Sequence, residues 1–113
     1  MPSKPTFFHT RAHLQICTSN QCSARGSQDL FVSVWKSLEQ EKLVYYTQGG
    51  NLRLTSSGCL GACHFGPTLA CYYQKNGQLE QAWYYGMDYP RTIQLARALH
   101  SGLELPQQGR FDK

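Results

Sequence analysis

Four cysteines arranged in two pairs constrain this chain more than any other feature of the sequence. Cys17 and Cys22 have four residues between them, and Cys59 and Cys63 have three between them. Both pairs fall in stretches rich in glycine, serine, asparagine or proline, which predicts loops. Thirty-six residues separate the two pairs. A fold that brings both loops to one edge of a sheet would therefore gather four thiolates.

The cysteine count also indicates the redox state of the chain. There are five cysteines in all, and the N-terminal Met1–Pro5 has no apolar segment typical of a secretion signal. An odd number of cysteines without a secretion signal argues against a framework of disulfides. We therefore expect thiols in the reducing cytoplasm, where cysteines are catalytic, metal-binding or buried.

Periodicity of apolar residues predicts the order strand, helix, strand, strand, strand, helix. Ser27 is expected to cap the first helix, Asn76-Gly77 to form a hairpin turn, and Asp88 to cap the last helix. Gly102 is the expected end of that helix. The predicted strands cover about 13–17, 52–54, 68–74 and 81–86, and the first helix covers 28–41.

This order predicts an α/β fold with a mixed four-stranded sheet. The first strand, helix and second strand imply a parallel pair with a right-handed crossover, and the hairpin adds antiparallel strands. The helices are expected to cover the faces of the sheet. We divide the 113 residues into an N-terminal tail (1–11), one folded domain (12–102) and a flexible C-terminal tail (103–113).

Four thiolates in two adjacent loops are typical of a zinc site or an iron–sulfur cluster. Zinc sites usually have two residues between paired cysteines, which allows a tight tetrahedral turn. Gaps of four and three residues make wider loops, which favour a two-iron cluster with two thiolates on each iron. Gly58, Gly61 and Gly66 surround the second pair, and backbone N–H groups can approach sulfur closely at glycine.

The neighbours of the cysteines extend this pattern. They read Cys17-Thr-Ser-Asn-Gln-Cys22 followed by Gly26-Ser27, and Gly58-Cys59-Leu60-Gly61-Ala62-Cys63 followed by Gly66-Pro67. The two strings, with the later Trp83-Tyr84 and Pro90, closely resemble the thioredoxin-like [2Fe–2S] ferredoxins. That family includes the small cluster-bearing component of respiratory NADH dehydrogenase and stand-alone bacterial ferredoxins. The resemblance spans about residues 12–101 and implies a thioredoxin-like fold with Cys17, Cys22, Cys59 and Cys63 as iron ligands.

The resemblance implies a one-electron carrier with one [2Fe–2S] cluster and no enzymatic reaction of its own. No GxGxxG or GxxxxGK[ST] fingerprint is present, so a separate reductase and a protein acceptor are expected partners. The chain has a formal charge of +4 and a pI near 8.9. An oxidised centre on four thiolates contributes about −2, and the remaining positive charge favours acidic docking patches on the partners.

Neither nucleic acid nor a membrane span is expected, whereas a second copy of the chain is a further expected partner. The basic residues are scattered along the chain, which argues against nucleic-acid binding. No apolar run approaches the ~18 residues of a membrane span. Members of the family can dimerise, so a homodimer is a further expectation.

Three alternatives to the electron carrier stay open. One is a zinc-stabilised interaction module, and another is a redox sensor in which the cluster is the signal. The third, a thiol oxidoreductase, would need a Cys-x-x-Cys pair, which this sequence lacks.

The remaining cysteine and the histidines are expected to be structural. Cys71 lies in the predicted strand 68–74 and is interpreted as a core residue, since unmodified cysteine is often buried. His64 follows Cys63 directly, but four cysteines already complete the ligand set, so we interpret it as a loop residue. His9, His13 and His100 have no partner at metal-ligand spacing.

Overall fold

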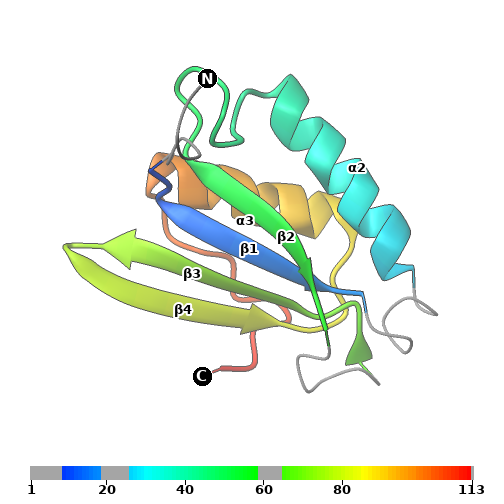
Figure 1. The fold of residues 1–113 in the computed structure, drawn as a ribbon. Coiled ribbons are helices and arrows are strands. Elements are labelled where there is room, and N and C mark those ends of the chain that lie inside the picture. The colour runs from blue at the N-terminus through cyan, green and yellow to red at the C-terminus, as the bar shows by residue number, and fades with distance from the viewer. Residues whose placement is uncertain (1–8, 19–25, 59–64, 113) are drawn as a thin grey trace.

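The computed structural model describes residues 9–18, 26–58 and 65–112 of the chain. The elements follow the expected order (Figure 1). They are β1 (Ala12–Cys17), α2 (Ser27–Gln40), β2 (Leu52–Ser57), β3 (Leu69–Lys75), β4 (Gln78–Tyr84) and α3 (Tyr89–Ser101). The cysteines Cys22, Cys59 and Cys63 and the tail 1–8 lie outside the described residues.

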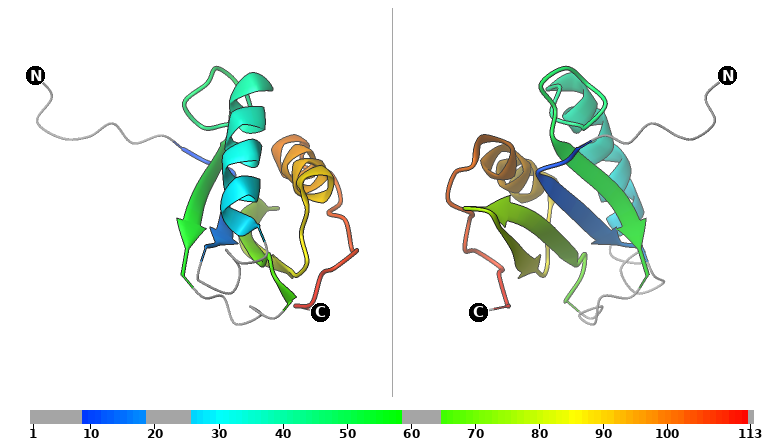
Figure 2. Two further views of the ribbon diagram at one scale, coloured as in Figure 1. Left: turned by 90° about the vertical axis from the view of Figure 1, so that its right-hand side faces the viewer. Right: turned by 60° about the vertical axis from the view of Figure 1, so that its left-hand side comes forward.

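The four strands form one mixed sheet in the order β2-β1-β3-β4. Strands β1 and β2 are parallel, and the β1–β3 and β3–β4 pairs are antiparallel. Seen along its edge, the sheet carries both helices on the same side (Figure 2). The helices pack on the sheet as expected, and α2 and α3 also pack against each other on that one face.

Alternation of side chains along the strands builds the core. Leu14 and Ile16 of β1 and Leu54 of β2 are buried beneath the helices, whereas the intervening His13 and Gln15 lie half-buried on the other face. Each helix turns a buried apolar stripe toward this layer. The stripe of α2 includes Leu30, Val34 and Leu38, and that of α3 includes Ile93, Leu95, Ala96 and Leu99.

The turn signals in the sequence are confirmed at the hairpin and at α3. Asn76 and Gly77 both have positive φ, 53° and 77°, as a tight turn between β3 and β4 requires. Asp88 caps α3, since its side chain accepts a hydrogen bond of 3.0 Å from the N–H of Arg91. Strand β4 begins and ends earlier than expected, at Gln78 and Tyr84.

The prediction for the start of α2 was wrong by one residue. Gly26, with a left-handed φ of 88°, occupies the cap position and makes no side-chain hydrogen bond there. Ser27 is instead the first residue of the helix and is fully buried. Only glycine adopts this backbone conformation without strain, so the chain turns into the helix through Gly26 rather than through a side-chain cap.

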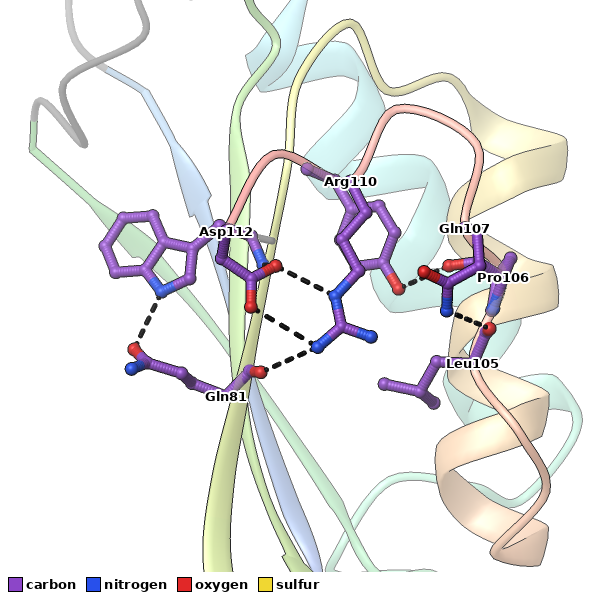
Figure 3. A network of polar contacts seen from close by, with 8 residues as sticks. Gln81, Leu105, Pro106, Gln107, Arg110 and Asp112 are labelled. Atoms are coloured by element: carbon purple, nitrogen blue, oxygen red, sulfur yellow. Dashed lines mark hydrogen bonds and ion pairs between the residues drawn. The ribbon is translucent and has the colours of Figure 1, made fainter.

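The C-terminal segment is packed against the sheet instead of extending as a flexible tail. The N–H of Phe111 donates to the carbonyl of Trp83 at 2.9 Å, and the Tyr84 hydroxyl donates to the carbonyl of Pro106 at 2.8 Å. Arg110 pairs with Asp112 at 2.8 Å, and only 6% and 16% of their side chains are exposed (Figure 3). The segment thereby covers part of the edge of β4.

Within the described residues, none of the helices is both long and apolar enough to cross a lipid bilayer.

Candidate functional site

The carboxyl ends of β1 and β2 lie side by side at one edge of the sheet. The two strands are parallel, and Cys17 is directly opposite Ser57 in their register. Beyond the strands the N–H of Thr18 still donates to the carbonyl of Ser57 at 2.9 Å. The segment with Cys22 follows Cys17, and the segment with Cys59 and Cys63 follows Gly58. Both segments therefore leave the sheet at the same place.

The residues that follow each cysteine segment also lie near this edge of the sheet. Gly26, which begins the return of the first segment, lines one groove with Pro67, which follows the second. Thr18, Gln28 and Ser56 line a neighbouring hollow. All four ends that flank the two cysteine segments thus meet at one edge of the sheet (Figure 1).

Cys17 is held firmly at this edge. Its side chain is fully buried, and its N–H donates to the carbonyl of Thr68 at 3.0 Å. Since β1 lies between β2 and β3 in the sheet, the backbone of Cys17 is supported from both sides. Of the four cysteines expected as ligands, Cys17 alone falls within the described residues. Among those residues, no group of three or more His, Cys, Asp or Glu side chains could hold a metal ion.

Ser27 is a second feature of this edge, and sequence reasoning missed its role. Its hydroxyl is the only buried side-chain oxygen or nitrogen in the described chain that has no hydrogen-bond partner. Leaving such a group unsatisfied costs about 1–3 kcal/mol, so it is an uncommon feature. Ser27 lies five residues after Cys22. A buried thiol and an unsatisfied hydroxyl donor suit a sulfur-rich cofactor, which is ligated by thiolates and accepts hydrogen bonds.

Cys71 lies away from this edge, in the middle of the sheet. It pairs with Leu14 of β1 and Ala82 of β4 and is fully buried. Burial raises the pKa of its thiol to about 12, so Cys71 stays protonated at neutral pH. Its surroundings agree with the core-packing role that the sequence indicated.

Two of the histidines make structural contacts. His13 lies 2.8 Å from the Thr55 hydroxyl across β1 and β2, and His100 lies 2.8 Å from the side-chain oxygen of Asn51. Burial, and to a smaller extent the nearby Arg53 charge, lowers the pKa of His13. Its imidazole is therefore neutral at physiological pH. His64 lies outside the described residues.

Exposed aromatic side chains surround the return of the second cysteine segment. Phe65 is 64% exposed and lies two residues after Cys63. Its ring centroid is 5.9 Å from that of Tyr85, which in turn lies 6.0 Å from Phe111. Contiguous exposed apolar side chains of this kind are typical of protein contact surfaces.

Together, the fold and this edge define a small α/β protein that presents two cysteine-bearing segments from parallel strand ends. Residues 7–83 match the family model described as thioredoxin-like [2Fe-2S] ferredoxin. Because the match covers more than half of the 113 residues, the chain belongs to the thioredoxin-like [2Fe–2S] ferredoxin family. The cofactor of this family is a [2Fe–2S] cluster.

Two curated relatives are E subunits of NADH-quinone oxidoreductase from Rhizobium meliloti (strain 1021), numbered 1 and 2. The one numbered 2 is 33% identical over 81 aligned residues, in a match that covers 68% of this chain and 48% of that protein. The one numbered 1 is 33% identical over 63 residues, which are 56% of this chain and 22% of that protein. The chain therefore spans less than half the length of either relative.

Solved structures of a ferredoxin confirm the fold class. The wild-type thioredoxin-like [2Fe-2S] ferredoxin from Aquifex aeolicus aligns with a TM-score of 0.71 at 20% identity, over 92% of this chain and 99% of that one. A cysteine-to-serine variant of the same ferredoxin aligns with a TM-score of 0.69 at 20% identity, over 90% and 99% of the two chains. At this identity the likeness concerns the fold.

Proposed function

We propose that the protein is a one-electron carrier with one [2Fe–2S] cluster held by Cys17, Cys22, Cys59 and Cys63. The observation that carries this proposal is the convergence of both cysteine segments on the edge where Cys17 ends β1. Family membership supplies the identity of the cofactor.

The bound cluster would supply reversible one-electron chemistry, and no bond of a substrate is made or broken. The chain's own part is to hold the ligands and to control the surroundings of the cluster. The backbone hydrogen bonds of Cys17 and Thr18 position the first ligand rigidly. The buried Ser27 hydroxyl is available to donate to a sulfur atom.

The partners in this proposal are a separate reductase and a protein acceptor. Two matched relatives are components of NADH-quinone oxidoreductases, which supports electron exchange with other redox proteins. The exposed rings of Phe65 and Tyr85 form a surface beside the second cysteine segment where a partner could approach. The net positive charge favours acidic patches on that partner, and a homodimer is compatible with these contacts.

We also propose the domain limits and the cellular location that the sequence led us to expect. Residues 12–102 form the ferredoxin domain, with the packed C-terminal segment as an addition to it. The cytoplasm is the proposed location, because a reducing compartment keeps the ligand thiols available.

The first test is a visible absorption spectrum with iron and acid-labile sulfide assayed on the same sample. We expect a red-brown protein with about two iron and two sulfide per chain that is reduced and reoxidised reversibly by one electron. A colourless protein with one zinc ion, after anaerobic purification and reconstitution, would instead establish the zinc-stabilised module. A cluster that is lost in air with a change in partner binding would favour the redox sensor.

A second prediction concerns Ser27. Replacing it with alanine should lower the reduction potential of the cluster, because a hydroxyl donor stabilises the more negative reduced state. The midpoint potential, measured by a redox titration monitored by EPR, provides the readout. Ser101 at the C-terminal end of α3 is exposed and lies outside the groove of Gly26 and Pro67, so Ser101→Ala is the control and should leave the potential unchanged. Equal potentials in wild type and Ser27→Ala would show that the hydroxyl does not contact the cluster.

A further inference from the structure

A polar groove lies at the end of the sheet opposite Cys17. It is bounded by the hairpin end of β3, by the C-terminal end of α3 and by the C-terminal segment, and its volume is about 210 Å³. Residues from four separate parts of the chain line it, among them Arg11, Lys75, Glu104 and Arg110. A groove of this size accepts a small ligand with its water but no large cofactor.

Arg110 is the buried element of this groove. Its side chain is 6% exposed, and the Nε and Nη2 atoms are fully engaged. Nε donates to Asp112 at 2.8 Å, and Nη2 donates to the carbonyl of Gln81 at 3.1 Å. The remaining nitrogen, Nη1, points away from Asp112 toward the side of Leu105 (Figure 3). A guanidinium held in this way presents a preoriented donor to the groove.

Arg11 is fixed on the opposite wall. Its backbone N–H donates to the carbonyl of Asn51 at 2.7 Å, and its carbonyl accepts from the N–H of Gln74 at 3.0 Å. Its guanidinium lies on Gly102, where a Cβ atom would come within 2.7 Å of Nη2. Glycine at this position, which also has a φ of 72°, lets Arg11 lie against the end of α3.

The charges around the groove favour an anion. Three cations, Arg11, Lys75 and Arg110, line it together with one carboxylate, Glu104. Asp112 behind Arg110 neutralises one further charge, so the lining keeps an excess of one positive charge. The carbonyl of Ala98 at the end of α3 is occupied by the N–H groups of Gly102 and Leu103, which reduces its repulsion of an anion.

From this arrangement we infer that the groove binds a small oxyanion, either a phosphate or a carboxylate. The Nη1 of Arg110 and the side chains of Arg11 and Lys75 donate to its oxygens. Arg11 lies six residues before Cys17, about 20 Å along an extended strand. The anion therefore has no contact with the cysteine edge, and the inference does not rest on the proposed function.

The test is an NMR titration of the ¹⁵N-labelled holoprotein with sodium phosphate and, separately, with sodium acetate. Sodium chloride is exchanged for each salt so that ionic strength stays constant. Saturable shifts of the amides of Leu103, Glu104 and Gln107 are expected. Saturation by phosphate alone assigns the site to phosphate, and saturation by acetate alone assigns it to carboxylates, including those on proteins. No saturable shift with either salt would overturn the inference.

Exposed residues of the rim allow variants that should fold normally. Arg11→Gln and Lys75→Gln should each raise the dissociation constant roughly tenfold, since each removes one charge-assisted hydrogen bond. Glu104→Gln should lower it, because a repulsive carboxylate is removed. Lys36→Gln on α2, at an exposed position outside the groove, is the matched control. Equal increases in the dissociation constant for Lys75→Gln and Lys36→Gln would show that binding depends only on the net charge of the protein. This result would also overturn the site.

Discussion

Cys17→Ala should yield a protein that binds no stable [2Fe–2S] cluster, whereas Cys71→Ala should keep its full iron and sulfide content. The two residues form a matched pair, because both side chains are fully buried and both lie in the central strands of the sheet. They differ in location, since Cys17 ends β1 at the edge from which both cysteine segments leave. Cys71 is enclosed between β1 and β4.

Alanine is the informative replacement, because serine keeps an oxygen that could remain a ligand. Iron and sulfide per chain and the visible absorption of the wild type and both variants provide the measurement. Circular dichroism of the same samples reports whether each variant is folded. Full iron content in folded Cys17→Ala would contradict the ligand assignment, and loss of iron in folded Cys71→Ala would assign a role to the fifth cysteine.

The parts of the fold that the sequence predicted are those specified by neighbouring residues. Asn76-Gly77 fixes the hairpin because two successive positive φ angles are needed there. Asp88 and Gly102 define α3 through its caps, which act within a few residues. The order of the strands and helices followed from such local signals and from apolar periodicity.

The remaining features depend on contacts between distant residues. The placement of both helices on one face requires α2 and α3 to contact each other, which no local pattern specifies. The orphan hydroxyl of Ser27 arises because Gly26 takes the cap position. At the site, the spacing of the cysteines favoured a two-iron cluster over a zinc ion. The parallel pair expected from the sequence already implied a common edge for the two loops, and the register of β1 and β2 adds that Cys17 lies opposite Ser57 there.

The packing of the C-terminal segment likewise depends on residues that are distant in the sequence. Residues 103–112 have no helical or strand periodicity, and their order comes from contacts with β4 some 25–30 residues earlier, such as Phe111 with Trp83 and Arg110 with Gln81. Arg110 links the two sides of this contact, since its guanidinium donates both to Asp112 of the segment and to the Gln81 carbonyl of β4.

Arg110→Met should therefore destabilise the protein by about 2–3 kcal/mol, because it leaves the Asp112 carboxylate, whose side chain is 16% exposed, without its ion-pair partner. For a chain of 113 residues this corresponds to a decrease in Tm of roughly 10 °C, measured on the holoprotein by circular dichroism. The control is Glu41→Gln, which removes the pair that Glu41 forms with Arg97 at 2.9 Å. That pair is exposed, so Tm should change little. Equal changes in Tm for the two variants would show that the buried position of the Arg110 pair adds nothing.

The pH dependence of the stability difference distinguishes loss of the ion pair from loss of packing. Burial alone would raise the pKa of Asp112, but hydrogen bonds from Arg110 and from the N–H of Trp83 outweigh it and lower this pKa. A lowered carboxyl pKa stabilises the fold above the unfolded value of about 4 and loses this effect as pH falls through the folded value. The Tm difference between wild type and Arg110→Met should thus be constant above about pH 6 and shrink as the pH falls below about 4, where Asp112 becomes protonated. A difference that stayed the same down to about pH 3 would show that the destabilisation comes from lost packing and not from the ion pair.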